Sequence, residues 1–139
     1  MAATFEDAFA EWRDNGSPDI PDGFDWPIDC ALTKLVNELS QWVDGNLGEA
    51  SDRERLWMRV TKVSEESGEV IQALVNYTGG NPRRTGSLAD VEVELLDAAL
   101  AALCAVAHLR GNTGDPIALL AAKARGVCAR AGLLLADDE

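Results

Sequence analysis

The chain is poor in the side chains that bind soft metals or form disulfide bonds. It has three cysteines and one histidine among 139 residues. Cys30, Cys104 and Cys128 are scattered, so the paired spacing of a zinc site is missing, and an odd count argues against a disulfide framework. His108 has no glutamate three residues before it, which excludes a di-iron bundle built on Glu-x-x-His pairs. We expect Cys104 and Cys128 to be small core residues and His108 to be structural.

Long apolar runs and an excess of positive charge are also missing. The apolar stretch after Asp97 is shorter than the roughly 20 residues that a membrane-spanning helix needs. The first residues lack the basic and apolar segments of a signal peptide. The formal net charge is −12, which disfavours nucleic acid as a partner. We therefore expect a cytoplasmic protein without a membrane or nucleic-acid partner. The net charge taken alone is explained more simply by an acidic surface that keeps the protein in solution.

Apolar residues recur at helical spacing, and no strand pattern is present. Ser51, with Glu54 three residues later, is typical of a helix start, as are Ser87 and the pair Asp115-Pro116. Four helices are predicted, over residues 28–47, 51–77, 88–110 and 115–135. Short connections between them favour an all-α four-helix bundle.

The chain before residue 28 differs from the rest in composition. Residues 3–13 have apolar side chains at helical spacing, and residues 14–27 are rich in proline and glycine turn signals. We therefore predict a short N-terminal helix and an arm over residues 1–27, followed by one helical domain over residues 28–139.

Two acidic groups stand inside the second and third predicted helices. Glu65, Glu66 and Glu69 lie in the second helix, and Glu94 and Asp97 lie in the third. Residues three or four apart share a helix face, and like charges at this spacing destabilise an isolated helix by roughly 0.2–0.5 kcal/mol per pair. A cation bound between two such groups would offset the repulsion among their like charges. Because all their ligand atoms are oxygens, we expect Mg²⁺, with Mn²⁺ as a substitute.

Asp97 is the most informative of these acids. It is the only charged residue between Leu95 and Ala107. A helix that is apolar on every side is usually buried, and buried acids are rare unless they are paired or bind a metal. We therefore expect Asp97 to be buried. Because one small subunit would struggle to surround this alanine-rich helix, we also expect a homo-oligomer that packs through it.

The order of these acids resembles a known signature. Glu65-Glu66-Ser67-Gly68-Glu69, then a spacer, then Glu94-Leu95-Leu96-Asp97 is similar to the paired motif of the all-α NTP pyrophosphohydrolase superfamily, the MazG-like and dimeric dUTPase-like group. The resemblance covers residues 28–109 and, more weakly, the rest of the chain. It implies a homodimer or homotetramer that uses Mg²⁺ to cleave a nucleoside triphosphate into the monophosphate and pyrophosphate, with house-cleaning of the nucleotide pool as its biological setting.

The resemblance also suggests roles for individual residues. Glu66, Glu69, Glu94 and Asp97 would hold the metal, and Glu65 would orient or deprotonate the attacking water. Asp90, one turn before Glu94, would support the metal ligands from outside. Lys123 and Arg130 are similar to the basic residues of the family's last helix, although Gly126 and Cys128 stand where a polar residue is expected.

Other candidate substrate contacts have a simpler structural explanation. Lys62 would contact phosphate or, more simply, form an ion pair with Glu66. Arg83 and Arg84 would contact phosphate or be plain loop cations. Trp42 and Trp57 would stack on a base or, more simply, pack in the core.

Two alternatives to this activity stay open. The acids are also compatible with a non-catalytic helical adaptor, in which they form a solvated or partner-binding face. The same catalytic residues would also suit a related hydrolase of another nucleotide, such as phosphoribosyl-ATP. Neither the base nor the sugar of the substrate is specified by these patterns, since both depend on the shape of the pocket.

Overall fold

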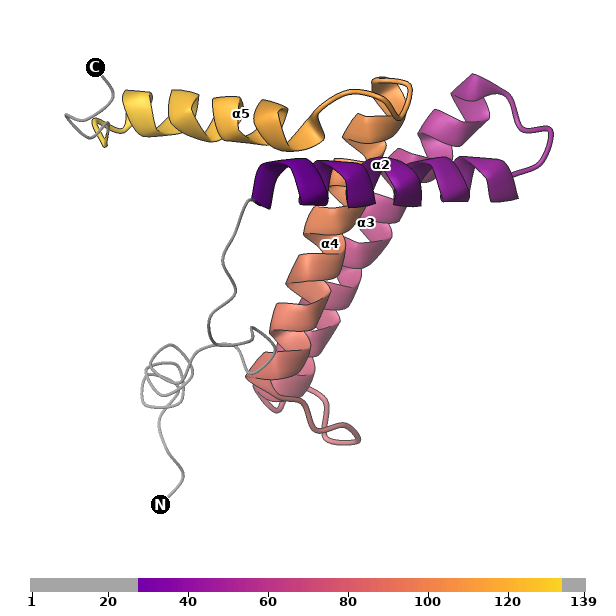
Figure 1. Cartoon of the computed structure of the whole chain (residues 1–139). Helices are drawn as coiled ribbons and strands as arrows, with labels where there is room; N and C mark the ends of the chain where they lie inside the picture. The colour runs from indigo at the N-terminus through magenta and orange to yellow at the C-terminus, as the bar shows by residue number, and fades with distance from the viewer. Residues whose placement is uncertain (1–27, 134–139) are drawn as a thin grey trace. The chain divides into compact units, whose positions relative to one another are not determined.

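The structure is a computed structural model that describes residues 28–133. Within that range the chain is all-helical and has no strand. The helices are α2 (Ile28–Asn46), α3 (Asp52–Tyr77), α4 (Leu88–Leu109) and α5 (Pro116–Arg130) (Figure 1). The predicted all-α class is confirmed. The helix expected at residues 3–13 and the arm up to residue 27 lie outside the described residues.

The predicted helix starts are confirmed in atomic detail. At the start of α3, the backbone nitrogen of Ser51 donates to Glu54 Oε2 at 2.7 Å, and the nitrogen of Glu54 donates to Ser51 Oγ at 3.2 Å. This reciprocal pair satisfies two backbone donors, and the hydrogen bonds from Ser51 hold the pKa of Glu54 below its usual value. At the start of α5, the carboxylate of Asp115 accepts from the nitrogen of Ala118 at 2.8 Å.

A second reciprocal cap begins α4. The backbone nitrogen and the hydroxyl of Ser87 both donate to Asp90 Oδ2 at 2.8 Å, and the nitrogen of Asp90 donates to Ser87 Oγ at 3.2 Å. One oxygen of the Asp90 carboxylate is therefore engaged in starting the helix. This gives Asp90 a structural role in addition to the metal-supporting role suggested for it.

The last helix is shorter than predicted. It ends at Arg130, not near residue 135, because Gly132 takes the left-handed conformation with φ of 70°. The nitrogen of Leu133 then donates to the carbonyl of Cys128 at 2.9 Å, a common way to close a helix after glycine. Gly132 was the sequence signal for this end.

The described residues belong to two compact units. Residues 65–98 form one unit, which contains the second part of α3, the loop at 78–87 and the first part of α4. Residues 28–64 and 99–133 belong to the other unit, which contains α2, α5 and the remaining parts of α3 and α4. Among the described residues, every helix is too short or too polar to cross a membrane.

The unit that contains α2 and α5 has a small core. Val36, Cys104 and Ala107 form its buried centre, and Leu32, Leu39 and Leu103 pack around them. Cys104 is a core residue as predicted, and burial raises the pKa of its thiol. The prediction that both tryptophans pack in the core was wrong, because Trp42 is 66% exposed and Trp57 is 65% exposed.

Polar contacts join the first part of α2 to the chain that leads into α5. The hydroxyl of Thr33 donates to Asp115 Oδ1 at 2.8 Å, and the side-chain amide of Asn37 donates to the carbonyl of Gly114 at 2.8 Å. These bonds place the start of α5 against α2 (Figure 1). Pro116, the first residue of α5, is fully buried there.

Candidate metal centre

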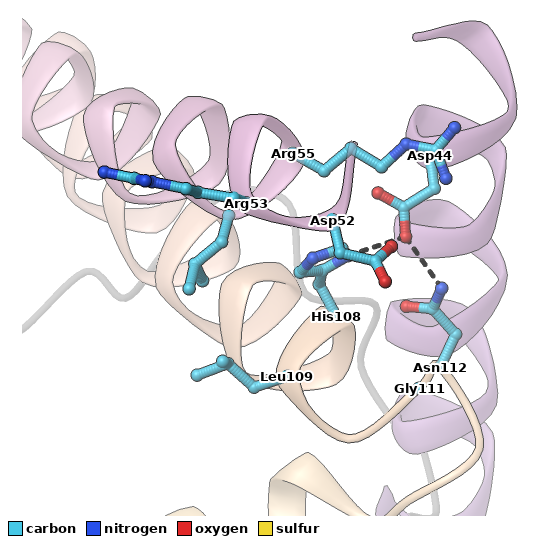
Figure 2. Close-up of a pocket in the computed structure, with 9 residues that line it drawn as sticks. Asp44, Asp52, Arg53, Arg55, His108, Leu109, Gly111 and Asn112 are labelled. Carbon is cyan, nitrogen blue, oxygen red and sulfur yellow. Dashed lines mark hydrogen bonds and ion pairs between the residues drawn. The ribbon is translucent and has the colours of Figure 1, made fainter. Parts of the chain in front are cut away.

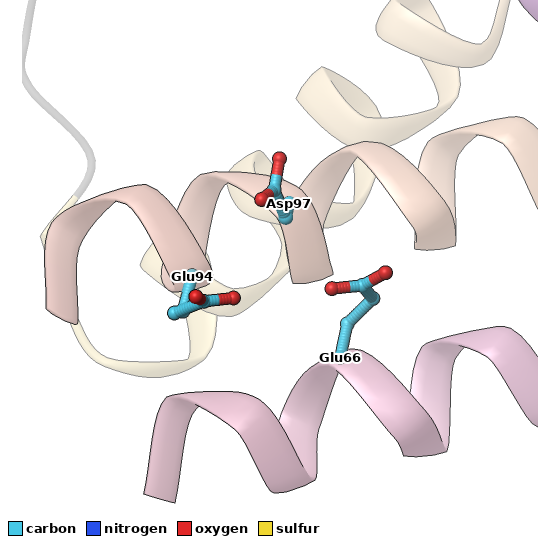
Figure 3. A group of neighbouring side chains, drawn as sticks. All are labelled: Glu66, Glu94 and Asp97. Atoms are coloured by element: carbon cyan, nitrogen blue, oxygen red, sulfur yellow. The ribbon is translucent and has the colours of Figure 1, made fainter. Parts of the chain in front are cut away.

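The two acidic groups meet in the unit formed by residues 65–98. Glu66 on α3 and Glu94 and Asp97 on α4 each present a carboxylate oxygen, and these oxygens all lie within 4.8 Å of one another. Figure 3 shows Glu66 extending from its helix toward the helix that carries the two other acids. Residues distant in sequence thus bring their carboxylates to one place.

The loop between α3 and α4 sets the pairing of the two helix segments. Gly79 takes the left-handed conformation with φ of 79°, and the nitrogen of Gly80 donates to the carbonyl of Val75 at 2.9 Å, which closes the end of α3. Gly86 lies against that same end, where a Cβ atom would come within 2.8 Å of the backbone nitrogen of Tyr77. The absence of a side chain at residue 86 therefore lets the loop turn back tightly, so that α4 returns beside α3.

The burial of the three acids differs from the prediction. Glu66 is the buried acid, with 7% of its surface exposed, whereas Glu94 is half-buried and Asp97 is exposed. The expectation that Asp97 is buried was wrong, because the face of α4 around it is not covered by the described chain. Leu95 and Leu96, its neighbours, are 53% and 61% exposed. An apolar helix is thus not necessarily surrounded within one subunit.

The donor set fits a hard divalent cation. It consists of three carboxylates, without a thiol or an imidazole, which favours Mg²⁺ or Mn²⁺ over zinc. Oxygens on opposite sides of Mg²⁺ lie about 4.2 Å apart, given Mg–O distances of about 2.1 Å. Carboxylate oxygens that are already within 4.8 Å of one another therefore need only small side-chain rotations to surround such an ion. The burial of Glu66 also distinguishes the group from an ordinary solvated acidic face.

The two remaining acids of the predicted motif lie outside this group of three. Glu69 is exposed and lines a neighbouring hollow, to which Glu94 also contributes. Glu65 is exposed on α3 and directly precedes Glu66. Glu94 therefore links the carboxylate group to the hollow that Glu69 lines.

The hollow has a volume of about 730 Å³ and lies among the end of α3, the loop and the start of α4. Its charged lining consists of Glu69, Arg83, Arg84, Asp90 and Glu94, and Gln72 and Asn76 add side-chain amides. Two of the predicted substrate contacts, Arg83 and Arg84, thus share a cavity with one of the grouped carboxylates.

The other predicted substrate contacts belong to the second unit. Trp42, Lys62, Lys123 and Arg130 are all exposed residues of that unit. Lys123 borders an apolar hollow of about 320 Å³, which is lined mainly by alanine, leucine and valine side chains of α4 and α5. The three grouped carboxylates belong to residues 65–98, so these four residues and the carboxylate group lie in different units.

The second unit has a polar pocket of its own. It has a volume of about 570 Å³ and contains His108, Asp44 and Asn112 together with the exposed side chains of Asp52 and Arg53 (Figure 2). Asp44 Oδ2 lies 2.8 Å from His108 Nδ1 and accepts from the Asn112 amide at 2.9 Å. Because a carboxylate only accepts hydrogen bonds, the proton between His108 and Asp44 belongs to Nδ1. His108 is thus a satisfied structural histidine, as predicted.

Asp44 is the centre of this network. Burial acts to raise its pKa, but the hydrogen bonds from Asn112, His108 and Arg59 outweigh burial and lower the pKa to about 2. Arg59, which is 5% exposed, donates to Asp44 Oδ1 at 3.0 Å and also to the carbonyl of Ser40. The hydroxyl of Ser40 lies 2.5 Å from Asn112 Oδ1. Since these polar groups bind one another, the network serves to hold the helices together.

The sequence contains a signal for this network outside the acidic motif. Leu32, Val36, Ser40 and Asp44 follow one another at intervals of four, so two polar residues continue the apolar stripe of α2. Polar side chains on a buried stripe need partners, and Arg59 is one of them.

Comparisons of the chain with models of known families, with curated proteins and with solved structures find no match. The case for a metal site therefore rests on the residues of the chain and on the geometry of their carboxylates.

Proposed function

We propose that the chain is a Mg²⁺-dependent nucleoside triphosphate pyrophosphohydrolase, which converts ribo- or deoxyribonucleoside triphosphates to the monophosphate and pyrophosphate. The observation that supports this most strongly is the meeting of Glu66, Glu94 and Asp97 from two helices within 4.8 Å. These acids stand at positions of the motif that resembles the all-α NTP pyrophosphohydrolases. The proposed setting is house-cleaning of the cytoplasmic nucleotide pool.

Glu66, Glu94 and Asp97 would hold the cation, with Mn²⁺ as a substitute for Mg²⁺. Glu69, three residues after Glu66, would add a further carboxylate from the side of the hollow. When bound, the cation would neutralise the charge of the triphosphate and of the pyrophosphate that leaves. In a chain with a net charge of −12, such neutralisation reduces the repulsion between a polyphosphate and the acidic side chains.

The reaction is an in-line displacement at the α-phosphorus. The oxygen of a water molecule forms a bond to that phosphorus, and the bond from the phosphorus to the α–β bridging oxygen breaks. The electron pair of the broken bond leaves with the bridging oxygen on pyrophosphate. We assign Glu65 as the base that accepts a proton from the water, the role that the resemblance suggests, and its exposure on α3 is compatible with that role.

The substrate contacts are assigned in two groups. Arg83 and Arg84 are proposed to bind phosphate, which is supported by the hollow that they share with Glu94. Four further residues are proposed to contact the substrate: Trp42, Lys62, Lys123 and Arg130. The exposure of Trp42 is compatible with stacking on a base.

The proposal includes a homodimer or homotetramer. It is supported by the exposed apolar side chains of residues 65–98, such as Ile71, Leu95 and Leu96. Helices that pack across a symmetric interface would remove these side chains from water. Light scattering of the purified chain should report at least a dimer, and a stable monomer would contradict this part of the proposal.

Pyrophosphate release tests the proposed activity. The purified chain is incubated with Mg²⁺ and a panel of common and damaged nucleoside triphosphates, and with phosphoribosyl-ATP as a separate substrate. We expect equal amounts of monophosphate and pyrophosphate from at least one triphosphate. Cleavage of phosphoribosyl-ATP alone would reassign the substrate, and the absence of any hydrolysis would leave the adaptor function.

The variant Asp97→Asn tests the proposed metal ligands in the same assay of pyrophosphate release. It removes one proposed ligand from an exposed position, so we expect the fold to persist and the rate to fall about 100-fold or more. Glu92→Gln is the control, because it removes the same charge from the same helix and, among the described residues, Glu92 belongs to no group of clustered acids. Retained activity in Asp97→Asn would remove Asp97 from the mechanism.

A further inference from the structure

The loop between α3 and α4 carries two cations that form no ion pair within the described part of the chain. Arg83 and Arg84 are adjacent and exposed, and both line the hollow of about 730 Å³. Among residues 28–133, neither guanidinium group forms an ion pair with a carboxylate. Acids outnumber basic residues two to one in this chain, with 24 against 12, so two adjacent unpaired arginines are unusual here.

The loop holds the two arginines in a defined place. The backbone nitrogen of Arg83 donates to Asn81 Oδ1 at 3.1 Å, and the nitrogen of Arg84 donates to the carbonyl of Asn81 at 3.2 Å. Gly86 fixes the other end of the loop by its close approach to Tyr77. Loops fixed in this way present their side chains at lower entropic cost to a ligand.

Both signs of charge face the same hollow. Glu69, Asp90 and Glu94 supply carboxylates, and Arg83 and Arg84 supply guanidinium groups. A bare anion would be repelled by the acids and a bare cation by the arginines, whereas a polyphosphate that carries a divalent cation matches both. Guanidinium groups bind phosphate oxygens in pairs, and carboxylates bind the cation. The volume also falls within the roughly 300–1,000 Å³ of small-ligand sites.

We infer that this hollow binds the terminal phosphates of the substrate, with Arg83 and Arg84 on the β- and γ-phosphates. The inference rests on the proposed function, because the β- and γ-phosphates leave together as pyrophosphate only if the cleavage is at the α-phosphorus. It fixes the direction of the substrate, because the α-phosphorus then lies toward the carboxylate group and the pyrophosphate toward the loop. Glu94 belongs to both the group and the hollow, so it lies between the two ends.

Binding of inorganic tripolyphosphate tests the inference without any catalytic step. Calorimetry with Mg²⁺ and tripolyphosphate compares the wild type with the double variant Arg83→Gln/Arg84→Gln. We expect the dissociation constant to rise by about 10- to 100-fold, as the loss of charged hydrogen bonds implies. The control is Arg110→Gln/Arg125→Gln, which removes the same charge from exposed positions of the other unit. Equal losses in both double variants, or undetectable binding to the wild type, would overturn the inference.

Steady-state kinetics then separates this inference from the proposed function. For a cleaved triphosphate, we expect Arg83→Gln/Arg84→Gln to raise KM about tenfold and to weaken inhibition by pyrophosphate, with Mn²⁺ affinity unchanged. If the wild type releases pyrophosphate but the double variant has the same KM and the same inhibition by pyrophosphate, the inference is wrong and the proposed function stands. If no triphosphate is cleaved but tripolyphosphate binds through the arginines, the polyphosphate site stands and the proposed function is wrong.

Discussion

The carboxylates of Glu66 on α3 and Asp97 on α4 approach within 4.8 Å, although Glu66 is buried and Asp97 is exposed. One side of the group therefore faces the interior between the helix segments and the other side faces outward. A cation bound to both acids would connect the two helix segments. Binding that occurs only in the folded state stabilises it, so metal affinity and the stability of this unit are coupled.

Neutralising one acid of the group should have opposite effects with and without metal. In a metal-free buffer, we expect Glu94→Gln to raise the free energy of unfolding by roughly 0.5 kcal/mol, because like charges close together repel. In Mg²⁺, the wild type should gain thermal stability and the variant should gain much less, because a ligand is missing. Differential scanning fluorimetry at several Mg²⁺ concentrations measures both effects.

Glu92→Gln is the control for that comparison, because it changes the charge of the same helix by the same amount. It should keep the Mg²⁺-dependent shift of the wild type. A shift of equal size in Glu94→Gln would show that Mg²⁺ acts elsewhere on the chain.

The two neighbouring glutamates of α3 should differ in what they contribute. Glu65→Gln should lower kcat by about 100- to 10,000-fold, the usual contribution of a general base, with metal affinity almost unchanged. Glu66→Gln should weaken metal binding itself, because Glu66 belongs to the carboxylate group. Calorimetric titration with Mn²⁺ and single-turnover kinetics separate the two effects. Loss of metal affinity in Glu65→Gln would make Glu65 a ligand instead of a base.

The polar network around Asp44 should make the fold sensitive to acid. The folded-state pKa of Asp44 is about 2, whereas an unfolded aspartate titrates near 3.9. A lowered pKa stabilises the fold fully above the unfolded value, and this contribution is lost as the pH falls from about 4 to about 2. Because Asp44 is partly screened by solvent, we expect its pH-dependent contribution to be about 1 to 2 kcal/mol.

The variant Asp44→Asn isolates this contribution. At pH 7 it should lower the free energy of unfolding by about 3 kcal/mol, because it leaves the buried Arg59 without a counter-charge. Urea unfolding of both proteins at pH 7, 4, 3 and 2.5 should show the difference narrowing below about pH 4. A difference that stays constant over this range would contradict the role of an ionised Asp44. Asp52→Asn, an exposed position in the same unit, serves as the control.

Two glycines of the 65–98 unit should respond in opposite directions to alanine. Gly86→Ala places a Cβ atom 2.8 Å from the backbone nitrogen of Tyr77, so the loop must move, and we expect a loss of about 1 to 3 kcal/mol. Gly68→Ala lies within α3 with nothing within 4 Å of the added atom, and we expect a gain of about 0.5 to 1 kcal/mol. Chemical denaturation measures both changes. Equal effects would contradict the tight closure of the loop.

Local signals predicted the helices well. Ser51 with Glu54 and Asp115 with Pro116 specify helix starts through bonds between residues close in sequence, and the structure contains those bonds. The prediction that the last helix runs to residue 135 was wrong, because the left-handed conformation of Gly132 ends α5 earlier. Such capping depends on a few neighbouring residues, so it can be recognised without knowledge of the tertiary structure.

The burial of individual acids was not predictable in the same way. Asp97 lies in the most apolar stretch of α4 but is exposed, whereas Glu66, in a polar stretch of α3, is buried. Burial depends on which face of each helix is covered by other segments of the same chain, and helical periodicity does not determine which face that is. The pairing of Asp44 with Arg59 and His108 is likewise a contact between distant residues, for which only the polar positions on the α2 stripe gave a signal.

X-ray diffraction from crystals grown with Mn²⁺ would show whether the grouped carboxylates bind a metal ion. Anomalous scattering locates manganese independently of any assumed site or activity. We expect a peak bounded by the carboxylates of Glu66, Glu94 and Asp97, and its absence from crystals of Glu94→Gln. A saturated crystal with no peak at this group, or with its manganese bound elsewhere, would contradict the claim that these acids form a metal centre.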